Sequence, residues 1–171
     1  MKRLCIFALA LGVLAAGCTS SPSTTNPTVS LKPVFLATLS SANEVPPITN
    51  AESGVTGTAT ITIDTTKDAA GNVISATTTF AVTLSGFPAG SAINIAHIHE
   101  GASTCACPVV VNTTLAAGEV AIANGSASFT KTVNATPEVA QRILANPGGF
   151  YFNVHSTLNP GGVARGQLRA Q

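Results

Sequence analysis

The sequence has little charge and few aromatic side chains. Charged residues make up 9% of the 171 residues and aromatic residues 5%, with one tyrosine and no tryptophan. Proteins that bind nucleic acid carry a clustered basic face, and no basic cluster occurs here. The chain also has no serine–histidine–acid grouping of recognisable spacing and no phosphate-binding glycine loop. These absences argue against nucleic-acid binding and give no motif for catalysis.

Long apolar runs are absent apart from one at the N-terminus. In "MKRLCIFALALGVLAAGC", two basic residues precede an apolar stretch, Leu4 to Ala16, that is too short to span a membrane as a stable helix. This pattern is typical of an export signal. The ending "LAAGC" resembles the bacterial lipobox, whose cysteine is lipidated and begins the mature chain, although Ala15 replaces the usual large apolar residue. We therefore expect a lipoprotein signal peptide at 1–17 and a lipid anchor on Cys18, with plain secretion after nearby cleavage as the alternative.

A segment rich in serine, threonine and proline follows Cys18. Residues 18–33 bury too little apolar surface to fold, so we interpret them as a disordered tether. Without Lys2 and Arg3, the mature chain of 154 residues holds six basic and seven acidic residues, a formal charge of −1. This length suits one domain, placed at 34–171. The organisation predicts a lipid-anchored protein of the bacterial cell envelope, in the outer membrane or facing the periplasm in a Gram-negative cell.

Polar and apolar residues alternate through most of the remaining chain. "TGTATITID", "TTTFAVTLSGF" and "GSASFTKTV" each place apolar side chains at every second position. Such a period with a polar second face indicates antiparallel sheets with one wet side, and residues 64–72 are expected to form a hairpin loop. Nine apolar residues are expected in the core: Ile61, Ile63, Phe80, Val82, Leu84, Ile98, Phe129, Phe152 and Val154.

One segment has helical rather than strand periodicity. In "ATPEVAQRILANPGG", Thr136 is a candidate N-cap and Pro137 suits the first helical position. An apolar stripe follows, and residues 146–148 stop the helix. One short helix among about eight strands predicts an all-β fold, an antiparallel β-sandwich with one short helix.

The three histidines of the chain occupy outward positions on two predicted strands. His97 and His99 share one face in "AHIH", and His155 shares a face with Tyr151 and Asn153 in "FYFNVHS". Neutral imidazoles suit copper and zinc, and three of them with an open coordination position form a recognised kind of site. The alternative is a metal-free polar cluster in which each imidazole hydrogen-bonds to the backbone.

Two further residue pairs are candidates for structural or chemical roles. Cys105 and Cys107 are separated by one residue, which in an exported protein favours a disulfide, with a thiolate ligand pair or two exposed thiols as alternatives. Glu44 is a candidate partner of Arg165 across the sandwich. An ordinary solvated glutamate is the alternative there.

Four motifs together resemble a known domain. "FLATLSSANEVPP", "AHIHEG", "FYFNVHSTLNPGG" and "RGQL" follow one another between 35 and 168 and are similar to the CHRD domain, first described in chordin and common in bacterial exported proteins. The chain differs from the family pattern at Val163, where a glutamate is usual, and at "CAC", where the loop is usually rich in glycine and asparagine. The resemblance marks four polar residues as part of the family motifs: Glu44, Asn153, Arg165 and Gln167.

A shorter resemblance links the histidine motifs to copper/zinc superoxide dismutases, which carry a His-x-His strand and a later Val-His strand on an immunoglobulin-like β-sandwich. It implies such a sandwich here, with His97, His99 and His155 as copper ligands and Arg165 near a substrate channel. The zinc-site residues have no counterpart, so redox turnover is a minor alternative and enzymatic activity is not expected. The sequence thus predicts an envelope module that binds copper or zinc through three histidines, with a metal-free structural or adhesion module, bound to an unidentified envelope partner, as the alternative.

The lipobox-like ending generates the first testable prediction. If Cys18 is lipidated, the mature protein fractionates with membranes, and mass spectrometry finds an acylated N-terminal peptide that begins at Cys18. A Cys18→Ser variant should lose both the acyl mass and the processing at this residue. A wild-type chain that is soluble, unmodified and begins elsewhere would contradict the prediction.

Overall fold

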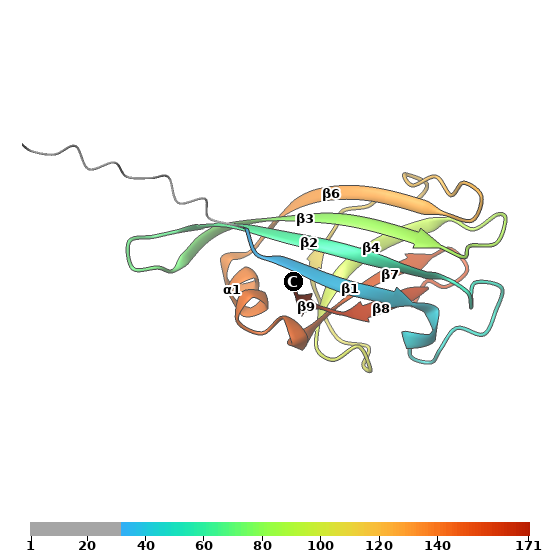
Figure 1. The fold of residues 1–171 in the computed structure, drawn as a ribbon, viewed down its shortest axis with the longest axis horizontal. Helices are drawn as coiled ribbons and strands as arrows, with labels where there is room; N and C mark the ends of the chain where they lie inside the picture. Colours follow the sequence, from blue (N-terminus) through green and yellow to red (C-terminus); the bar gives the residue numbers. More distant parts are fainter. Residues whose placement is uncertain (1–31) are drawn as a thin grey trace, which may run out of the picture. The chain divides into compact units, whose positions relative to one another are not determined.

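The computed structural model describes residues 32–171. The predicted signal peptide, Cys18 and most of the predicted tether lie outside these residues. Nine strands, one α-helix and two short 3-10 helices follow one another in the described part (Figure 1): β1 Val34–Ser40, η1 Ser41–Asn43, β2 Thr56–Lys67, β3 Val73–Ser85, β4 Ile93–Glu100, β5 Val109–Asn112, β6 Ala127–Ala135, α1 Pro137–Ala145, η2 Pro147–Gly149, β7 Phe150–Ser156, β8 Ala164–Gln167 and β9 Arg169–Ala170. None of the helices in this part of the chain is long and apolar enough to cross a membrane.

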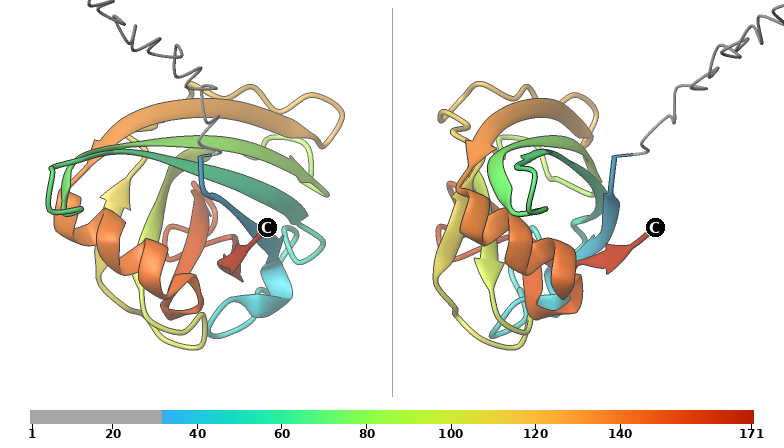
Figure 2. Two further views of the ribbon diagram at one scale, coloured as in Figure 1. Left: turned by 60° about the vertical axis from the view of Figure 1, so that its left-hand side comes forward. Right: turned by 90° about the vertical axis from the view of Figure 1, so that its left-hand side faces the viewer.

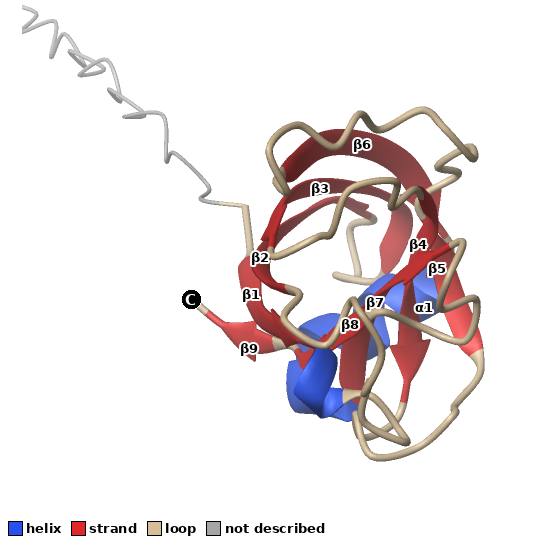
Figure 3. Cartoon of the chain, turned by 90° about the vertical axis from the view of Figure 1, so that its right-hand side faces the viewer, coloured by secondary structure: helices blue, strands red, loops and turns tan. Residues whose placement is uncertain are grey.

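All the strands belong to one antiparallel sheet. Their order is β5-β4-β7-β8-β1-β2-β3-β6, and β9 pairs with β1. The sheet curls until its two halves face each other, so that it is nearly closed like a barrel (Figures 2 and 3). The predicted all-β antiparallel fold with one short helix is confirmed. The two layers of the expected sandwich are the halves of a single curled sheet, joined where β8 pairs with β1 at Arg165 and Ser40.

The inner face of the curled sheet forms the core. Phe80 of β3 and Phe152 of β7 stack with ring centroids 5.5 Å apart, and this contact joins the two halves. Eight of the nine expected core residues are buried. Phe129 is only partly buried and packs against the core, because it lies on β6, an edge strand with a neighbour on one side only.

The helix begins and ends as the sequence indicates. The Thr136 side chain accepts a hydrogen bond from the backbone N–H of Val139 at 3.3 Å, which satisfies one of the free donors at the helix N-terminus. Pro137 occupies the first turn, and α1 buries Val139, Ala140 and Ile143. The helix lies at one end of the curled sheet (Figure 2).

Two local features differ from the sequence expectations. The hairpin loop is shorter than 64–72, because β2 continues to Lys67 and β3 begins at Val73; the Asp68 carboxylate accepts hydrogen bonds from the backbone of Ala70 and Asn72 and holds the tighter turn. The outer face of the sheet is also not exposed to solvent along its whole extent. Every residue of β7 is buried, so the polar outer side of this strand lies inside the protein.

The Phe80–Phe152 contact generates a stability prediction. Phe152 has no exposed surface, so a Phe152→Ala substitution should lower the free energy of unfolding by about 3–5 kcal/mol, the usual cost of removing a buried phenyl ring. Ile74, which is 56% exposed, provides the control, and Ile74→Ala should change stability by less than about 0.5 kcal/mol. Urea denaturation measures both. A loss below about 1 kcal/mol for Phe152→Ala would show that this face is not core.

Candidate metal centre

Polar side chains from neighbouring strands meet on the outer face of β4 and β7. The strand register places His97 opposite Asn153 and His99 opposite Tyr151. His155 lies two residues beyond Asn153 and therefore on the same side of β7. The alternation seen in the sequence thus brings all three histidines to one face. The two strands that carry them, β4 and β7, are neighbours in the sheet (Figure 3).

The three imidazole rings converge. Ring centroids are 4.4 Å apart for His97 and His155, 4.6 Å for His97 and His99, and 6.4 Å for His99 and His155. One nitrogen from each ring lies within 4.8 Å of the others. The three side chains are buried, each with 6–8% of its surface exposed. The structure therefore brings together the three residues that the sequence singled out as metal ligands.

Backbone carbonyls fix the protonation of two of the rings. Nδ1 of His99 lies 2.6 Å from the carbonyl oxygen of Cys107, and Nδ1 of His155 lies 2.8 Å from that of Pro160. Because a carbonyl oxygen only accepts hydrogen bonds, each Nδ1 carries the proton and each Nε2 keeps its lone pair. Both Nε2 atoms are buried without a hydrogen-bond partner, and so is Nδ1 of His97. The cluster therefore contains three unpaired ring nitrogens.

Burial keeps the cluster uncharged. Desolvation, reinforced by the nearby His155 and His99, lowers the pKa of His97 from 6.5 to about 3. Desolvation also lowers the pKa of His99 and of His155, although the hydrogen bonds to the Cys107 and Pro160 carbonyls oppose it. All three imidazoles are therefore neutral at pH 7. Neutral imidazole is the form that binds metal ions.

Tyr151 and Arg165 support the ring of His99. The Tyr151 ring stacks on His99 at a centroid distance of 4.6 Å and an interplanar angle of 3°. The Arg165 guanidinium lies 5.0 Å from the centroid of the Tyr151 ring, within the range of a cation–π contact. The Tyr151 hydroxyl donates to the Cys105 carbonyl at 2.9 Å and accepts from the backbone N–H of Cys107 at 3.2 Å. His99 is thus held by an aromatic stack on one side and a backbone carbonyl at Nδ1.

Glu44 and Arg165 form a buried ion pair beside the histidines. Nε and Nη2 of Arg165 both lie 2.6 Å from Oε2 of Glu44, and each residue is 3% exposed. Nη1 donates to the carbonyls of Cys105 at 2.8 Å and Ser103 at 3.3 Å. Burial raises the pKa of Glu44, and Arg165 opposes this shift. The two residues considered as partners from the sequence therefore meet. Together they connect the segment after η1, which holds Glu44, to the loop between β4 and β5.

Asn153 and Gln167, the other family-motif residues, differ in their hydrogen bonding. Gln167 is satisfied, because its Oε1 accepts from the backbone N–H of Ser103 at 2.7 Å and its Nε2 contacts three backbone carbonyls, the nearest that of Phe150 at 2.6 Å. Asn153 is 1% exposed, and neither its amide nitrogen nor its amide oxygen has a partner. Gln167 thus anchors a loop, whereas Asn153 keeps unused hydrogen-bonding capacity next to His97.

Cys105 and Cys107 are joined by a disulfide, with their Cα atoms 5.4 Å apart. The bond lies in the loop between β4 and β5, whose carbonyls contact His99, Tyr151 and Arg165. The alternative considered from the sequence, in which the imidazoles hydrogen-bond to the backbone, matches the contacts of His99 and His155, but the sequence does not reveal which carbonyls take part. Every residue carries a carbonyl, so the sequence holds no signal for them.

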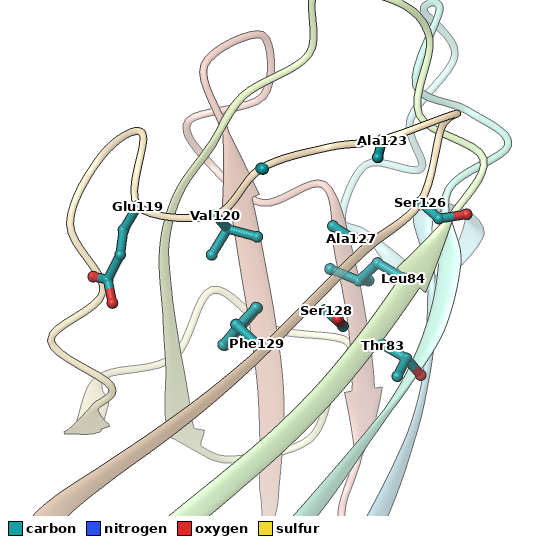
Figure 4. A pocket seen from close by; sticks show the side chains of 10 residues that line it. Thr83, Leu84, Glu119, Val120, Ala123, Ser126, Ala127, Ser128 and Phe129 are labelled. Atoms are coloured by element: carbon teal, nitrogen blue, oxygen red, sulfur yellow. The ribbon is translucent and has the colours of Figure 1, made fainter.

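A buried carboxylate and a hollow in the surface are two further features, and neither includes any of the three histidines. Glu52, which the sequence analysis did not single out, is fully buried and accepts hydrogen bonds from Ser91, Ser156 and Asn159, so its carboxylate is satisfied. The hollow in Figure 4 is lined by small and apolar side chains of β3, β6 and residues 119–126, and Glu119 is its one charged residue. None of the three histidines lines this hollow.

The fold and the site define a class of protein: an antiparallel all-β domain with three buried histidines on the outer face of one half of the sheet. The chain belongs to the CHRD domain family, whose model matches residues 35–168. No curated protein and no solved structure matches the chain. Membership in this family suggests an extracellular or envelope module.

The lowered histidine pKa values generate a pH prediction. An imidazole in the unfolded chain takes up a proton near pH 6.5, whereas the buried imidazole of the folded state resists protonation. The folded state therefore has its full stability above about pH 6.5 and loses stability as pH falls toward the folded pKa. With a folded pKa of about 3, His97 alone should cost about 2 kcal/mol of unfolding free energy between pH 7 and pH 5. Urea denaturation at both values measures the loss.

The carboxylates whose pKa values are shifted do not account for a loss of stability between pH 7 and pH 5. The pKa values of Asp68 and Glu119 are lowered by hydrogen bonds, so the stability they contribute is lost mainly below pH 5. Glu44, whose pKa is raised by burial, favours the folded state when protonated and therefore acts in the opposite direction. A His97→Asn variant should show a smaller difference between pH 7 and pH 5. Equal stability of the wild type at the two values would contradict the prediction.

Proposed function

We propose that this protein is a lipid-anchored envelope protein whose CHRD domain binds one copper or zinc ion through His97, His99 and His155. One observation carries the proposal: three neutral imidazoles place ring nitrogens within 4.8 Å of one another, and on each ring one buried nitrogen has no hydrogen-bond partner. A buried polar atom left unpaired costs about 1–3 kcal/mol. A metal ion that accepts all three lone pairs would remove this cost.

The donor set fits copper and zinc better than other common metal ions. Imidazole nitrogen suits these two metals, whereas calcium and magnesium require oxygen ligands. No carboxylate belongs to the converging group in the described part of the chain. His99 and His155 also donate Nδ1–H to backbone carbonyls, which is the usual way in which proteins orient metal-binding histidines.

Three protein ligands leave a coordination position open on copper or zinc. A bound ion would therefore supply a Lewis-acidic centre able to take a further ligand. The chain's own residues hold the rings in place: Tyr151 stacks on His99, and Arg165, which is paired with Glu44, lies over the Tyr151 ring.

Two features support an envelope location. The N-terminal sequence has the form of a lipoprotein signal that ends at Cys18. The disulfide between Cys105 and Cys107 suits an oxidising compartment, where such bonds persist. The segment between Cys18 and β1 would separate the domain from the lipid surface.

A second candidate is a structural or adhesion module without metal. Its support is that His99 and His155 each bind the carbonyl of a covering loop, at Cys107 and Pro160. In this case the histidines serve to hold the two loops against the sheet. The two candidates differ in whether metal binds to the folded protein and stabilises it.

Calorimetric titration of the metal-free protein with zinc and with copper tests the proposal. We expect one equivalent to bind, and metal at one hundred times its dissociation constant to raise the free energy of unfolding by about 2.7 kcal/mol. His97→Ala and His155→Ala should each weaken binding by more than about 100-fold, since even removal of an outer partner of a ligand costs 10–100-fold. Thr132→Ala, an exposed change on β6, is the control and should leave affinity unchanged.

The opposite outcome favours the second candidate. In that case neither metal binds or stabilises the folded protein, and the histidine substitutions lower its stability to the same extent with and without metal. Binding that survives both histidine substitutions would also exclude the proposed site.

A further inference from the structure

The loop between β4 and β5 holds several side chains of the histidine site through two backbone carbonyls. The Cys107 carbonyl accepts from Nδ1–H of His99 at 2.6 Å. The Cys105 carbonyl accepts from the Tyr151 hydroxyl at 2.9 Å and from Nη1 of Arg165 at 2.8 Å. The loop therefore determines the orientation of one candidate ligand directly, and of the aromatic ring stacked on it.

The disulfide fixes the relative position of these two carbonyls. Only Ala106, an exposed residue, separates Cys105 from Cys107. Both sulfur atoms pack so closely over Gly101 that a Cβ atom at that position would collide with them. Gly101 itself is tied to η2 by a hydrogen bond from its N–H to the Gly149 carbonyl at 2.6 Å. The closed disulfide thus packs the loop against Gly101, whose position is fixed by its hydrogen bond to Gly149.

We infer that the Cys105–Cys107 disulfide is a redox-controlled positioning element for His99, which tightens metal binding when the disulfide is closed and weakens it when the disulfide is reduced. This inference rests on the proposed metal-binding function. In the reduction, a dithiol gives two electrons and two protons to the S–S bond. The two cysteines become thiols and the dithiol becomes a disulfide.

The position of the disulfide suits such a role. Cys105 and Cys107 are partly exposed whereas His99 is buried, so a reductant reaches the sulfur atoms without entering the histidine cluster. Exposed disulfides are the more easily reduced ones. A disulfide that closes so short a loop also contributes little to the stability of the whole fold, because loop-closure entropy grows with loop length. Reduction should therefore act on the loop and leave the sheet intact.

Release of the loop would act on His99 through its outer hydrogen bond. Without the Cys107 carbonyl, Nδ1–H has no fixed acceptor, and the ring loses the contact that sets its tautomer and orientation. Loss of such an outer partner usually weakens metal binding by about 10–100-fold. His155, whose Nδ1 binds the Pro160 carbonyl in a different loop, should keep its orientation.

Zinc is the appropriate probe, because it has no redox chemistry and does not oxidise thiols as copper(II) does. We expect zinc to bind the protein about 10–100-fold more weakly after reduction with a phosphine, which takes oxygen from water to become its oxide while the disulfide becomes two thiols. Mass spectrometry of the peptide that contains Cys105 and Cys107 confirms the redox state. The Cys105→Ser/Cys107→Ser double variant should match the reduced wild type and should not respond to phosphine. Ala106→Ser, which keeps the disulfide, should match the oxidised wild type.

Nuclear magnetic resonance of the metal-free protein provides a second measurement. In the oxidised protein, the Nδ1 protons of His99 and His155 should both exchange slowly with water. Reduction should make the His99 proton exchange rapidly and leave that of His155 unchanged, which makes His155 an internal control for folding.

The outcomes separate this inference from the proposed function. If the oxidised protein binds neither zinc nor copper, the proposed function fails. Whenever zinc does not bind, the His99 signal alone decides whether the disulfide positions this ring. Equal zinc affinity in both redox states, with an unchanged His99 signal, would overturn the inference while leaving the metal site in place. Tighter zinc binding after reduction would also overturn it, because the thiolates would then be acting as ligands.

Discussion

A single strand that is buried on both faces, β7, imposes the constraint on which the rest of the structure depends. Its inner side chains, among them Phe152, belong to the core, so the strand cannot turn its polar side chains inward. The outer side chains Tyr151, Asn153 and His155 are also shielded from water, so hydrogen-bond partners for them can come only from within the protein. Loop carbonyls supply partners for Tyr151, at Cys105, and for His155, at Pro160, whereas both amide atoms of Asn153 stay unpaired. The candidate metal centre therefore forms where the polar side chains of β7 are enclosed by a second layer, which consists of the loop between β4 and β5 and the loop after β7.

The ion pair of Arg165 and Glu44 holds this second layer together. A buried guanidinium needs a charge partner and acceptors for its remaining donors; Glu44 supplies the charge, and the carbonyls of Cys105 and Ser103 supply two acceptors. The pair lies near the seam where β8 meets β1 and the two halves of the sheet join. Gly166 follows directly, and its Cα lies so close to the Thr38 carbonyl that a Cβ atom would collide with it. In the "RGQ" motif, Arg165 thus pairs with Glu44, Gly166 allows a close strand contact, and Gln167 binds the backbone of the loop between β4 and β5.

The sequence predicts those features that depend on local periodicity. Alternation in "AHIH" and "FYFNVHS" is sufficient to place the histidines on one type of face, and the Thr136–Pro137 pair is sufficient to place the start of the helix. Features that depend on distant segments are not predictable in this way. The β8–β1 seam, the partial exposure of Phe129 at a sheet edge, and the enclosure of the outer face of β7 all arise from pairings and loops remote in sequence. The lowered histidine pKa values follow from that enclosure, so they too require the structure.

Gln167 and the histidines occupy the same covered face, and the difference between them bears on function. The loops satisfy both polar atoms of the half-buried Gln167 with backbone partners, whereas both amide atoms of the buried Asn153 stay unpaired. In the histidine cluster, each ring keeps one buried nitrogen unpaired, and the three rings bring their nitrogens together. A cluster that served only to hold loops would gain about 1–3 kcal/mol for each such nitrogen by pairing it. The carbonyls of Cys107 and Pro160 instead bind the Nδ1 atoms and leave the Nε2 lone pairs free. In His99 and His155, one ring nitrogen is held by the backbone and the other is left available, and this division supports the proposed metal site.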